Sequence, residues 1–462
     1  MAHMEPPVKK SEKIDLRING INHSGEGVGR YGEFAVFVPG TVPGETVTAE
    51  VVELKKNYAR GRLLEIKERS QRRTNPECAY FSACGGCHLQ YIDYEELLRL
   101  KTVLVRDSLA RIASLEGVTV HNAIGMEFPW RYRNKARFQV KESGGKLSLG
   151  FFEEGSRNLA ACFRDGLKSG CLLVDMELNE IASTVETLLN KHTGSFAGSF
   201  RHVVLRKAFG TGELMAVVVT GSEEWPGEKR FAGELLSLHP GLTSIVRNIN
   251  DGPPGVVMGR ENRALAGRDY ITDRLGHLVF RISPSSFYQV NPVQALVLYQ
   301  KTLAYAALTG EETVVDAYSG VGTIALFLAG HAEKVYGLEA VPDAVKDARS
   351  NAALNRIGGV QFLEGQVERL LPALSAKGVY PDVVVLDPPR RGCGRETLDT
   401  AAALRVPRIV YVSCNPGTMA RDLGILKGGG YRVVEAQPVD MFPWTYHVES
   451  IVQIKRAENR MG

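Results

Sequence analysis

The stretch VSCNPGTMARD, residues 412–422, places a thiol where it could act as a nucleophile. The apolar run that ends at Ser413 predicts a strand, and Asn-Pro-Gly after Cys414 predicts a turn that leads into a helix. A thiol near a helix N-terminus lies in a field that favours the thiolate form. A cysteine on an apolar strand can equally be a buried structural residue, so this stretch alone leaves both interpretations open.

Two carboxylates could work with such a thiol. Asp387 in VVVLDPPRRG follows a predicted buried strand, and open α/β sheets bind ligands beyond the carboxyl ends of their strands. Methyltransferases of exocyclic amines carry a similar acid-Pro-Pro sequence with an aromatic residue next, whereas Arg390 follows here. Glu449 in MFPWTYHVES comes just after His447 and before the last predicted strand, and it is a candidate general base.

A nucleotide-type cofactor site is predicted over residues 313–340. The run TVVDAYSGVGTIALFLA gives a strand, a glycine turn and a helix, and Gly320 and Gly322 allow a ligand to approach the backbone and the helix N-terminus. Glu339 ends the next predicted strand, where a carboxylate can accept hydrogen bonds from ribose hydroxyls. The ligand could be a dinucleotide or S-adenosylmethionine, and the missing third glycine favours S-adenosylmethionine.

Three cysteines form a tight cluster with the spacing C-x5-C-x2-C, at Cys78, Cys84 and Cys87. Thiolates in this arrangement suit zinc or an iron–sulfur cluster, although the spacing is not that of a zinc ribbon. A fourth ligand would have to come from Cys162 or Cys171, which lie far along the chain.

The elements that must position these residues change in character along the chain. Residues 11–70 show short alternating strands with glycine turns, which predict a small β-barrel with basic and aromatic residues near its end. Residues 130–280 are rich in strand-like runs. From about residue 290, apolar strands alternate with helices, which predicts a parallel sheet with crossover helices.

Bulk composition limits the function classes. The 462 residues carry a formal net charge of only +4, so any nucleic-acid surface must be local. No apolar run approaches the roughly 18 residues of a membrane helix, and the N-terminal residues lack a secretory pattern. We therefore expect a cytoplasmic protein with no membrane partner, in which clustered cysteines hold metal or do chemistry.

Taken in order, these motifs resemble the RNA uracil-5-methyltransferases, specifically the 23S ribosomal RNA branch with a TRAM domain and a four-iron cluster. The resemblance covers residues 11–456 and is carried by the cysteine cluster, SSFYQVN, DAYSGVGTIAL, LDPPRRG, VSCNPGTMARDL and DMFPWTYHVE. It implies an OB-like TRAM barrel over 11–70, a central β-rich domain with the iron–sulfur loop over 74–280, and a Rossmann-like methyltransferase domain over 281–462.

The resemblance also assigns roles to individual residues. The metal ligands fall on Cys78, Cys84, Cys87 and Cys171, which leaves Cys162 spare. The S-adenosylmethionine contacts fall on Gln289, Tyr318, Glu339 and Asp387, around Gly320 and Gly322. Cys414 matches the nucleophile and Glu449 the base. Ser319 and Trp444 depart from the family pattern, where cysteine and histidine are frequent, but neither falls on an acting residue.

The implied reaction, of enzyme class 2.1.1, methylates carbon 5 of a uridine through a covalent bond between Cys414 and carbon 6. The uridine must be unpaired or flipped out of its helix. The barrel and the basic strip of Arg131, Arg133, Lys135 and Arg137 would hold the RNA, with no obligate protein partner. The choice of ribosomal over transfer RNA rests on the resemblance alone, and the sequence does not identify the uridine.

Three other functions compete with this interpretation. A methyltransferase of exocyclic amines would need no thiol. An iron–sulfur RNA-binding or chaperone protein would keep only a vestigial S-adenosylmethionine fold, and an oxidoreductase would bind a dinucleotide.

Overall fold

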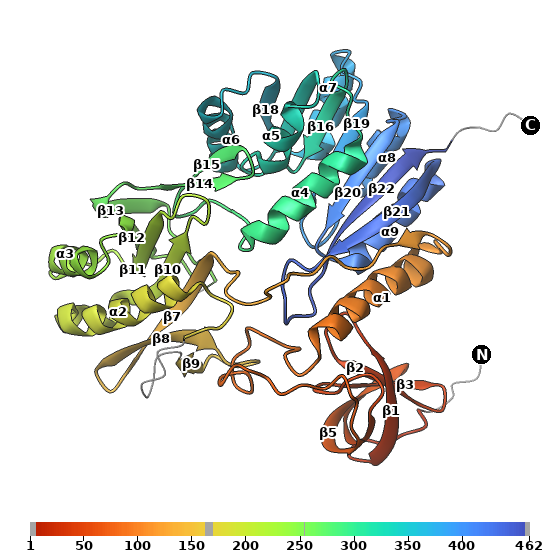
Figure 1. Cartoon of the computed structure of the whole chain (residues 1–462), viewed down its shortest axis with the longest axis horizontal. Coiled ribbons are helices and arrows are strands. Elements are labelled where there is room, and N and C mark those ends of the chain that lie inside the picture. Colours follow the sequence, from red (N-terminus) through yellow and green to blue (C-terminus); the bar gives the residue numbers. More distant parts are fainter. Residues whose placement is uncertain (1–5, 162–169, 254, 458–462) are drawn as a thin grey trace, which may run out of the picture.

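The computed structural model describes residues 6–161, 170–253 and 255–457. The chain forms a small barrel at its N-terminal end, a seven-stranded sheet in its middle and an eight-stranded sheet at its C-terminal end (Figure 1). No helix in these ranges has both the length and the hydrophobicity needed to cross a bilayer.

The N-terminal barrel is closed, with strand order β1-β2-β3-β5-β4. Along β1 every second side chain is buried, and Ile14, Leu16 and Ile18 point into the barrel core. This period of two is the pattern from which a barrel is predicted. The strands are β1 (Lys13–Ile21), β2 (Gly27–Tyr31), β3 (Phe34–Val38), β4 (Thr46–Leu54) and β5 (Tyr58–Glu68).

The central sheet has the order β13-β12-β11-β10-β7-β8-β9. One face packs on α2 and α3 around Phe138, Leu205 and Trp225, and the other faces the C-terminal part of the chain. Its strands are β7 (Lys135–Ser143), β8 (Lys146–Phe152), β9 (Leu159–Ala161), β10 (Phe200–Lys207), β11 (Leu214–Thr220), β12 (Leu242–Ile249) and β13 (Glu261–Gly267). Its helices are α2 (Met176–His192), η1 (Gly194–Ser199) and α3 (Glu228–Leu238).

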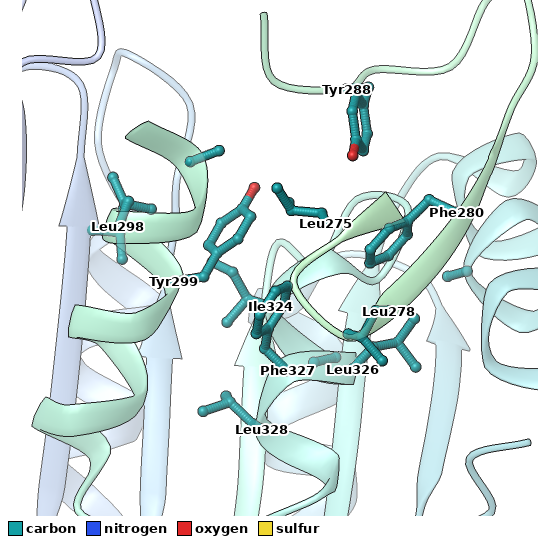
Figure 2. Close-up of a cluster of buried hydrophobic side chains, with 14 of the residues drawn as sticks. Leu275, Leu278, Phe280, Tyr288, Leu298, Tyr299, Ile324, Leu326, Phe327 and Leu328 are labelled. Carbon is teal, nitrogen blue, oxygen red and sulfur yellow. The ribbon is translucent and has the colours of Figure 1, made fainter. Parts of the chain in front are cut away.

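A hairpin of β14 (Ile271–Leu275) and β15 (Leu278–Ile282) joins the two halves of the molecule. Figure 2 shows Leu275, Leu278 and Phe280 of this hairpin next to side chains from α4 and α5. The hydrophobic core therefore continues from the central sheet into the C-terminal domain.

The C-terminal sheet has the order β18-β17-β16-β19-β20-β22-β21-β6. Strands β18 to β20 run parallel, as the alternation of helices and strands predicts, and β22 is antiparallel to its neighbours. The strands are β16 (Thr313–Ala317), β17 (Lys334–Glu339), β18 (Val360–Glu364), β19 (Val383–Leu386), β20 (Arg408–Ser413), β21 (Tyr431–Val439) and β22 (Glu449–Arg456).

Helices cover both faces of this sheet. One face packs on α4 (Pro292–Ala306), α5 (Thr323–Ala329) and α6 (Pro342–Leu354). The other packs on α7 (Val367–Ala376), α8 (Arg395–Ala403), α9 (Pro416–Gly428) and α1 (Tyr94–Ala113). Helix α1 and strand β6 (Thr119–Val120) precede the central sheet in the chain, yet both pack on the C-terminal sheet, where β6 pairs with β21.

Candidate active site

The strand order of the C-terminal sheet reverses between β16 and β19. The chain winds outward from β16 to β17 and β18, then returns to place β19 and β20 on the other side. At such a switch point the loops after the two central strands diverge and leave room for a ligand. Tyr318 and Asp387 directly follow β16 and β19, and the backbone N–H of Asp387 lies 3.4 Å from the carbonyl oxygen of Ala317.

The glycine turn after β16 is shaped for close approach to the backbone. Gly320 and Gly322 have φ angles of 55° and 85°, in the left-handed region that glycine adopts without strain. A Cβ on Gly322 would lie 2.7 Å from the ring of Phe362, whereas nothing lies within 4 Å of a Cβ on Gly320. Gly322 is therefore required by packing, and Gly320 borders open space.

Glu339 is fixed at the end of β17. Its two carboxylate oxygens accept the backbone N–H groups of Gly320 and Val341, at 2.9 Å and 2.8 Å. These bonds set the carboxylate beside the glycine turn, where its remaining lone pairs can accept hydrogen bonds from a ligand.

This edge of the sheet concentrates carboxyl groups. Burial, followed by the carboxylates of Asp387 and Glu339, raises the pKa of Asp316 well above its usual range. The backbone N–H of Ala325 lowers the pKa of Asp316 in part and does not cancel the rise. Burial also raises the pKa of Asp387 to about 7. A cationic ligand would relieve this crowding, and S-adenosylmethionine carries a positive sulfonium and an ammonium group, so these residues fit it.

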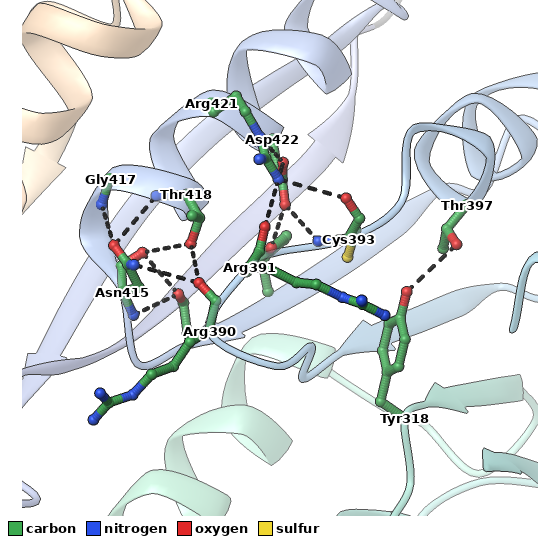
Figure 3. Close-up of polar contacts among 12 residues, drawn as sticks. Tyr318, Arg390, Arg391, Cys393, Thr397, Asn415, Gly417, Thr418, Arg421 and Asp422 are labelled. Atoms are coloured by element: carbon green, nitrogen blue, oxygen red, sulfur yellow. Dashed lines mark hydrogen bonds and ion pairs between the residues drawn. The ribbon is translucent and has the colours of Figure 1, made fainter. Parts of the chain in front are cut away.

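Gln289 and Tyr318 lie on different sides of this switch point. Gln289 lies beside the buried hydroxyl of Tyr299 on α4, and that hydroxyl also lies near Asp387. The hydroxyl of Tyr318 instead points to Glu368 and Thr397 of α7 and α8, at 3.5 Å from each (Figure 3 draws its contact with Thr397). Of Tyr318, only the backbone and ring are left to line a cofactor pocket.

Cys414 lies in a turn that hydrogen bonds make rigid. The side chain of Asn415 accepts the N–H groups of Gly417 and Thr418 at 3.0 Å and 3.3 Å, which caps α9. The same side chain donates to the carbonyl oxygen of Arg390 at 3.3 Å, and the Thr418 hydroxyl donates to it at 3.1 Å (Figure 3). The loops after β19 and β20, which carry Asp387 and Cys414, are thereby tied together.

Glu449 faces Cys414 because β22 runs antiparallel to β20. Ser413 pairs with Ser450, so the next pair in the same register sets Cys414 opposite Glu449. Burial and then the charge of Asp387 raise the pKa of Glu449 to about 8. Burial and then the charge of Glu449 raise the pKa of Cys414 to about 11, while Arg390 lowers it. The thiol and the two carboxylates therefore form one electrostatically coupled group.

Arg390 is a functional candidate to which the sequence alone assigns no role. Its guanidinium lowers the pKa of both Cys414 and Glu449 and lies 3.4 Å from the imidazole of His447. The signal was present in the sequence, since Arg390 occupies the same proline-stiffened turn as Asp387.

The loop between β21 and β22, residues 440–448, is held by distant parts of the chain. The buried ammonium group of Lys101 on α1 forms an ion pair with Asp440, and the Tyr94 hydroxyl donates to the same carboxylate at 2.8 Å. The carbonyl oxygen of Trp444 accepts the N–H groups of His88 and Leu89 at 3.0 Å and 3.1 Å. Glu449 is therefore positioned in part by α1 and by the cysteine loop.

Cys78, Cys84, Cys87 and Cys171 line one pocket, together with Arg133 and Gln90. Burial raises the pKa of the three loop thiols, Cys78, Cys84 and Cys87. The neighbouring Cys171 adds to this rise at Cys87, whose pKa reaches about 12. None of the four is in a disulfide bond. Cys162, the other sequence candidate, lies outside the described residues.

The shape of this pocket bears on which metal group it could hold. In the described ranges, no three His, Cys, Asp or Glu side chains converge closely enough to bind a single metal ion. Four thiols around one cavity, with the cationic Arg133 beside them, still fit a larger, negatively charged cluster better than one zinc ion. Arg133 lines this pocket, and Arg131 donates to the carbonyl oxygens of Cys171 and Val174 beside it.

Comparisons with known proteins agree with this site. Residues 256–457 match the family model described as tRNA (Uracil-5-)-methyltransferase, and residues 7–64 match the TRAM domain. A crystal structure of the Pyrococcus abyssi tRNA (uracil-54, C5)-methyltransferase with S-adenosyl-L-homocysteine superposes with a TM-score of 0.73 at 25% identity, over 96% of this chain and 100% of that one. Fold and site thus define an S-adenosylmethionine-dependent methyltransferase with an N-terminal TRAM barrel.

Full-length relatives make the assignment narrower. An uncharacterized RNA methyltransferase of Halalkalibacterium halodurans is 42% identical over 98% of this chain and 99% of its own. Another, from Caldanaerobacter subterraneus, is 44% identical over 97% and 99%. The chain belongs to the RNA uracil-5-methyltransferase family.

Proposed function

We propose that the protein methylates carbon 5 of a uridine in 23S ribosomal RNA, with Cys414 as nucleophile and Glu449 as base. The observation that carries this proposal is the coupling of Cys414, Glu449 and Asp387 at one edge of the sheet, next to the glycine turn. An amine methyltransferase would not need a thiol at this position.

The cofactor would lie along the ends of β16, β17 and β19. Glu339 would accept hydrogen bonds from its ribose, Gly320 and Gly322 would border it, and Gln289, Tyr318 and Asp387 would complete the pocket. S-adenosylmethionine supplies an electrophilic methyl group at its sulfonium, and the neighbouring carboxylates favour that positive charge.

Carbon 5 of uracil is a weak nucleophile until a thiolate adds to carbon 6. Cys414, which is partly exposed, first loses its proton to water, and Arg390 stabilises the thiolate. The S–C6 bond then forms, the C5=C6 electrons move onto the O4 side as an enolate, and carbon 5 becomes the site that accepts the methyl group. Glu449 takes the proton left on carbon 5, and the returning electrons expel Cys414.

A pKa near neutrality suits Glu449 for that proton transfer. Its pKa of about 8 makes it a stronger base than an ordinary glutamate once it is ionised. Arg390 and His447 make an exposed contact near Cys414, and a flipped uridine would enter there.

We further propose that Cys78, Cys84, Cys87 and Cys171 hold a four-iron cluster. Methyl transfer consumes no electrons, so the cluster's proposed role is to organise the cysteine loop. That loop in turn supports residues 440–448 through His88 and Leu89.

Cys414→Ala tests the mechanism. We expect methyl transfer from labelled S-adenosylmethionine to 23S ribosomal RNA to fall below detection, and a 5-fluorouridine RNA to trap a covalent adduct with the unmodified protein only. Cys393→Ser is the matched control, because it removes a buried thiol away from Cys414 and keeps a side chain that can bond Tyr318 and Tyr411; it should keep both activities. Full methylation by Cys414→Ala would eliminate the covalent mechanism. Mass-spectrometric mapping of 5-methyluridine identifies the RNA and the position.

A further inference from the structure

The turn that carries Arg390, residues 388–393, has its backbone fixed by α9. The carbonyl oxygen of Arg390 accepts two hydrogen bonds from the N-terminal end of this helix. The carbonyl oxygen of Arg391 accepts another, at 2.9 Å, from the guanidinium of Arg421 further along the helix. Figure 3 shows the Arg390 side chain leaving the turn in the direction away from Arg421. The helix therefore holds the backbone of the turn and leaves the Arg390 guanidinium free to face the catalytic site.

Asp422 is the fixed point behind this turn, because its carboxylate is completely buried and well provided with donors. One carboxylate oxygen accepts two hydrogen bonds from the guanidinium of Arg421, at 2.8 Å and 2.6 Å. The other accepts the backbone N–H of Cys393 at 2.8 Å and the hydroxyl of Tyr411 at 2.6 Å. Tyr411 belongs to β20, the strand that ends next to Cys414. Asp422 thus joins the turn, α9 and the strand of the nucleophile.

Gly392 provides the space that this arrangement needs. Its φ angle of 81° lies in the left-handed region, and a Cβ on it would lie 2.5 Å from both the Arg421 guanidinium and the Asp422 carboxylate. A larger residue would therefore push the pair away from the turn. The glycine in the sequence RRGCG, residues 390–394, is explained by this close approach.

The Arg390 side chain depends on the turn for its position. It is exposed, and its guanidinium lies as far as 3.4 Å from the imidazole of His447. Its charge nevertheless acts on the catalytic pair, since it lowers the pKa of both Cys414 and Glu449. A Coulomb interaction weakens with distance, so a displaced turn would weaken this effect.

We propose that Asp422 and Arg421 are positioning residues for methyl transfer, which fix the turn so that the guanidinium of Arg390 stays beside Cys414. Neither residue is assigned a contact with the reacting atoms. Arg421 acts by holding the carbonyl oxygen of Arg391, and Asp422 acts by orienting Arg421 and holding the turn at its end. This inference rests on the proposed function, in which Cys414 is the nucleophile, and adds the residues that prepare its thiolate.

Alkylation of Cys414 by iodoacetamide tests the proposal without RNA or cofactor. The thiolate is the reacting form, so the rate between pH 7 and pH 10 reports how readily the thiol ionises, and peptide mapping by mass spectrometry separates Cys414 from the other cysteines. We expect Arg421→Gln and Asp422→Asn to move the pH profile to higher pH. The rate at pH 8 should fall about 3- to 10-fold, the range expected when a cation next to a thiolate is withdrawn. Arg390→Gln should give the same change.

Arg395→Gln is the matched control. Arg395 lines the same surface groove as Arg421 and forms an ion pair with Asp399 on its own helix. This variant removes an equal charge from that groove without releasing the turn, so the pH profile of Cys414 should stay unchanged. The double variant Arg390→Gln with Arg421→Gln should react as slowly as Arg390→Gln alone, because the effect of Arg421 passes through Arg390.

An unchanged pH profile in Arg421→Gln would overturn the proposal, and so would a double variant whose loss is the product of the two single losses. A purely structural role would lower the melting temperature and leave the profile in place. Arg421 is half exposed, so its variant decides the question even if Asp422→Asn does not fold. If Arg421→Gln moves the profile while the unmodified protein methylates no RNA, the positioning role holds and the proposed function fails.

Discussion

The molecule contains two thiol sites that share their elementary physics and differ in what surrounds them. In the cysteine pocket, four thiols lie around one cavity with Arg133 as the neighbouring cation. At the end of β20, one thiol lies between two carboxylates with Arg390 as the cation. Burial raises the thiol pKa in both places, to about 12 at Cys87 and about 11 at Cys414.

The two sites differ in the group that can take up the negative charge of a thiolate. Thiols that surround a cavity can all lose protons together only if a metal group takes up their charge. A lone thiol beside a glutamate of similar environment can pass through a thiolate and return, which is the requirement for a nucleophile that must later leave. The number and arrangement of neighbours, and not the pKa shift itself, separates a ligand set from a catalytic thiol.

Replacing one cysteine in each site by serine gives the largest expected effects on iron content and on methylation. We expect Cys87→Ser to lose the iron, from about four atoms per chain to nearly none, because one ligand of the set is gone. Cys414→Ser should keep its iron and lose methylation. Iron and sulfide analysis of anaerobically prepared protein, beside a methylation assay, measures both. Stoichiometric zinc in the unmodified protein would contradict the cluster, and iron loss in Cys414→Ser would contradict the separation of the two sites.

Glu449→Gln should slow methylation about 10²- to 10⁴-fold, the usual contribution of a positioned general base. Addition of Cys414 to the ring does not need this carboxylate, so the RNA–protein adduct should accumulate on unmodified substrate. Denaturing gels of the reaction mixture detect that adduct. A slow variant with no adduct would show that Glu449 acts before carbon–sulfur bond formation.

The ion pair that holds residues 440–448 predicts an effect on the free energy of unfolding. Lys101→Met leaves the buried carboxylate of Asp440 without its ion-pair partner, and loss of one partner of such a pair costs about 3–5 kcal/mol. We expect a marked drop in the denaturant midpoint of the C-terminal domain. Asp440→Leu added to Lys101→Met removes the stranded charge and should recover a large part of the loss, although the Tyr94 hydroxyl then lacks its acceptor. A double variant as unstable as the single one would contradict this account.

The strand-to-turn motifs of the C-terminal domain are predictable from sequence because they are local. The alternation of helices and apolar strands predicts the parallel sheet, and the carboxyl ends of parallel strands always share one edge. For that reason Tyr318, Glu339 and Asp387 can be expected to lie near one another without any knowledge of tertiary structure. The alternating pattern of β1 in the N-terminal barrel is local in the same way.

The rest depends on contacts between distant residues. Glu449 faces Cys414 only because the last strand runs antiparallel beside β20, and no local pattern gives that direction. The pairing of β6 with β21 joins residues more than 300 positions apart, as the Lys101–Asp440 ion pair also does. Arg131 and Arg133 have the sequence of an RNA-binding strip and are instead directed to the cysteine pocket by the fold around them.

A pH dependence of stability is expected from the catalytic site alone. The folded protein holds a proton on Glu449 up to about pH 8, whereas an unfolded chain releases it near 4.5. This group therefore contributes stability that is complete below pH 4.5 and is lost as the pH rises through 8. Glu449→Gln keeps a neutral side chain at every pH. A rise in pKa from 4.5 to about 8 corresponds to roughly 5 kcal/mol. We therefore expect the variant's melting temperature to exceed that of the unmodified protein by several degrees at pH 9 and by nothing measurable at pH 5. The thiols of the cysteine pocket do not contact this carboxylate, so Cys87→Ser should leave the change in melting temperature between pH 5 and pH 9 as it is in the unmodified protein. If Glu449→Gln instead raises the melting temperature equally at pH 5 and pH 9, Glu449 is ionised in the folded protein and is not held neutral by its burial.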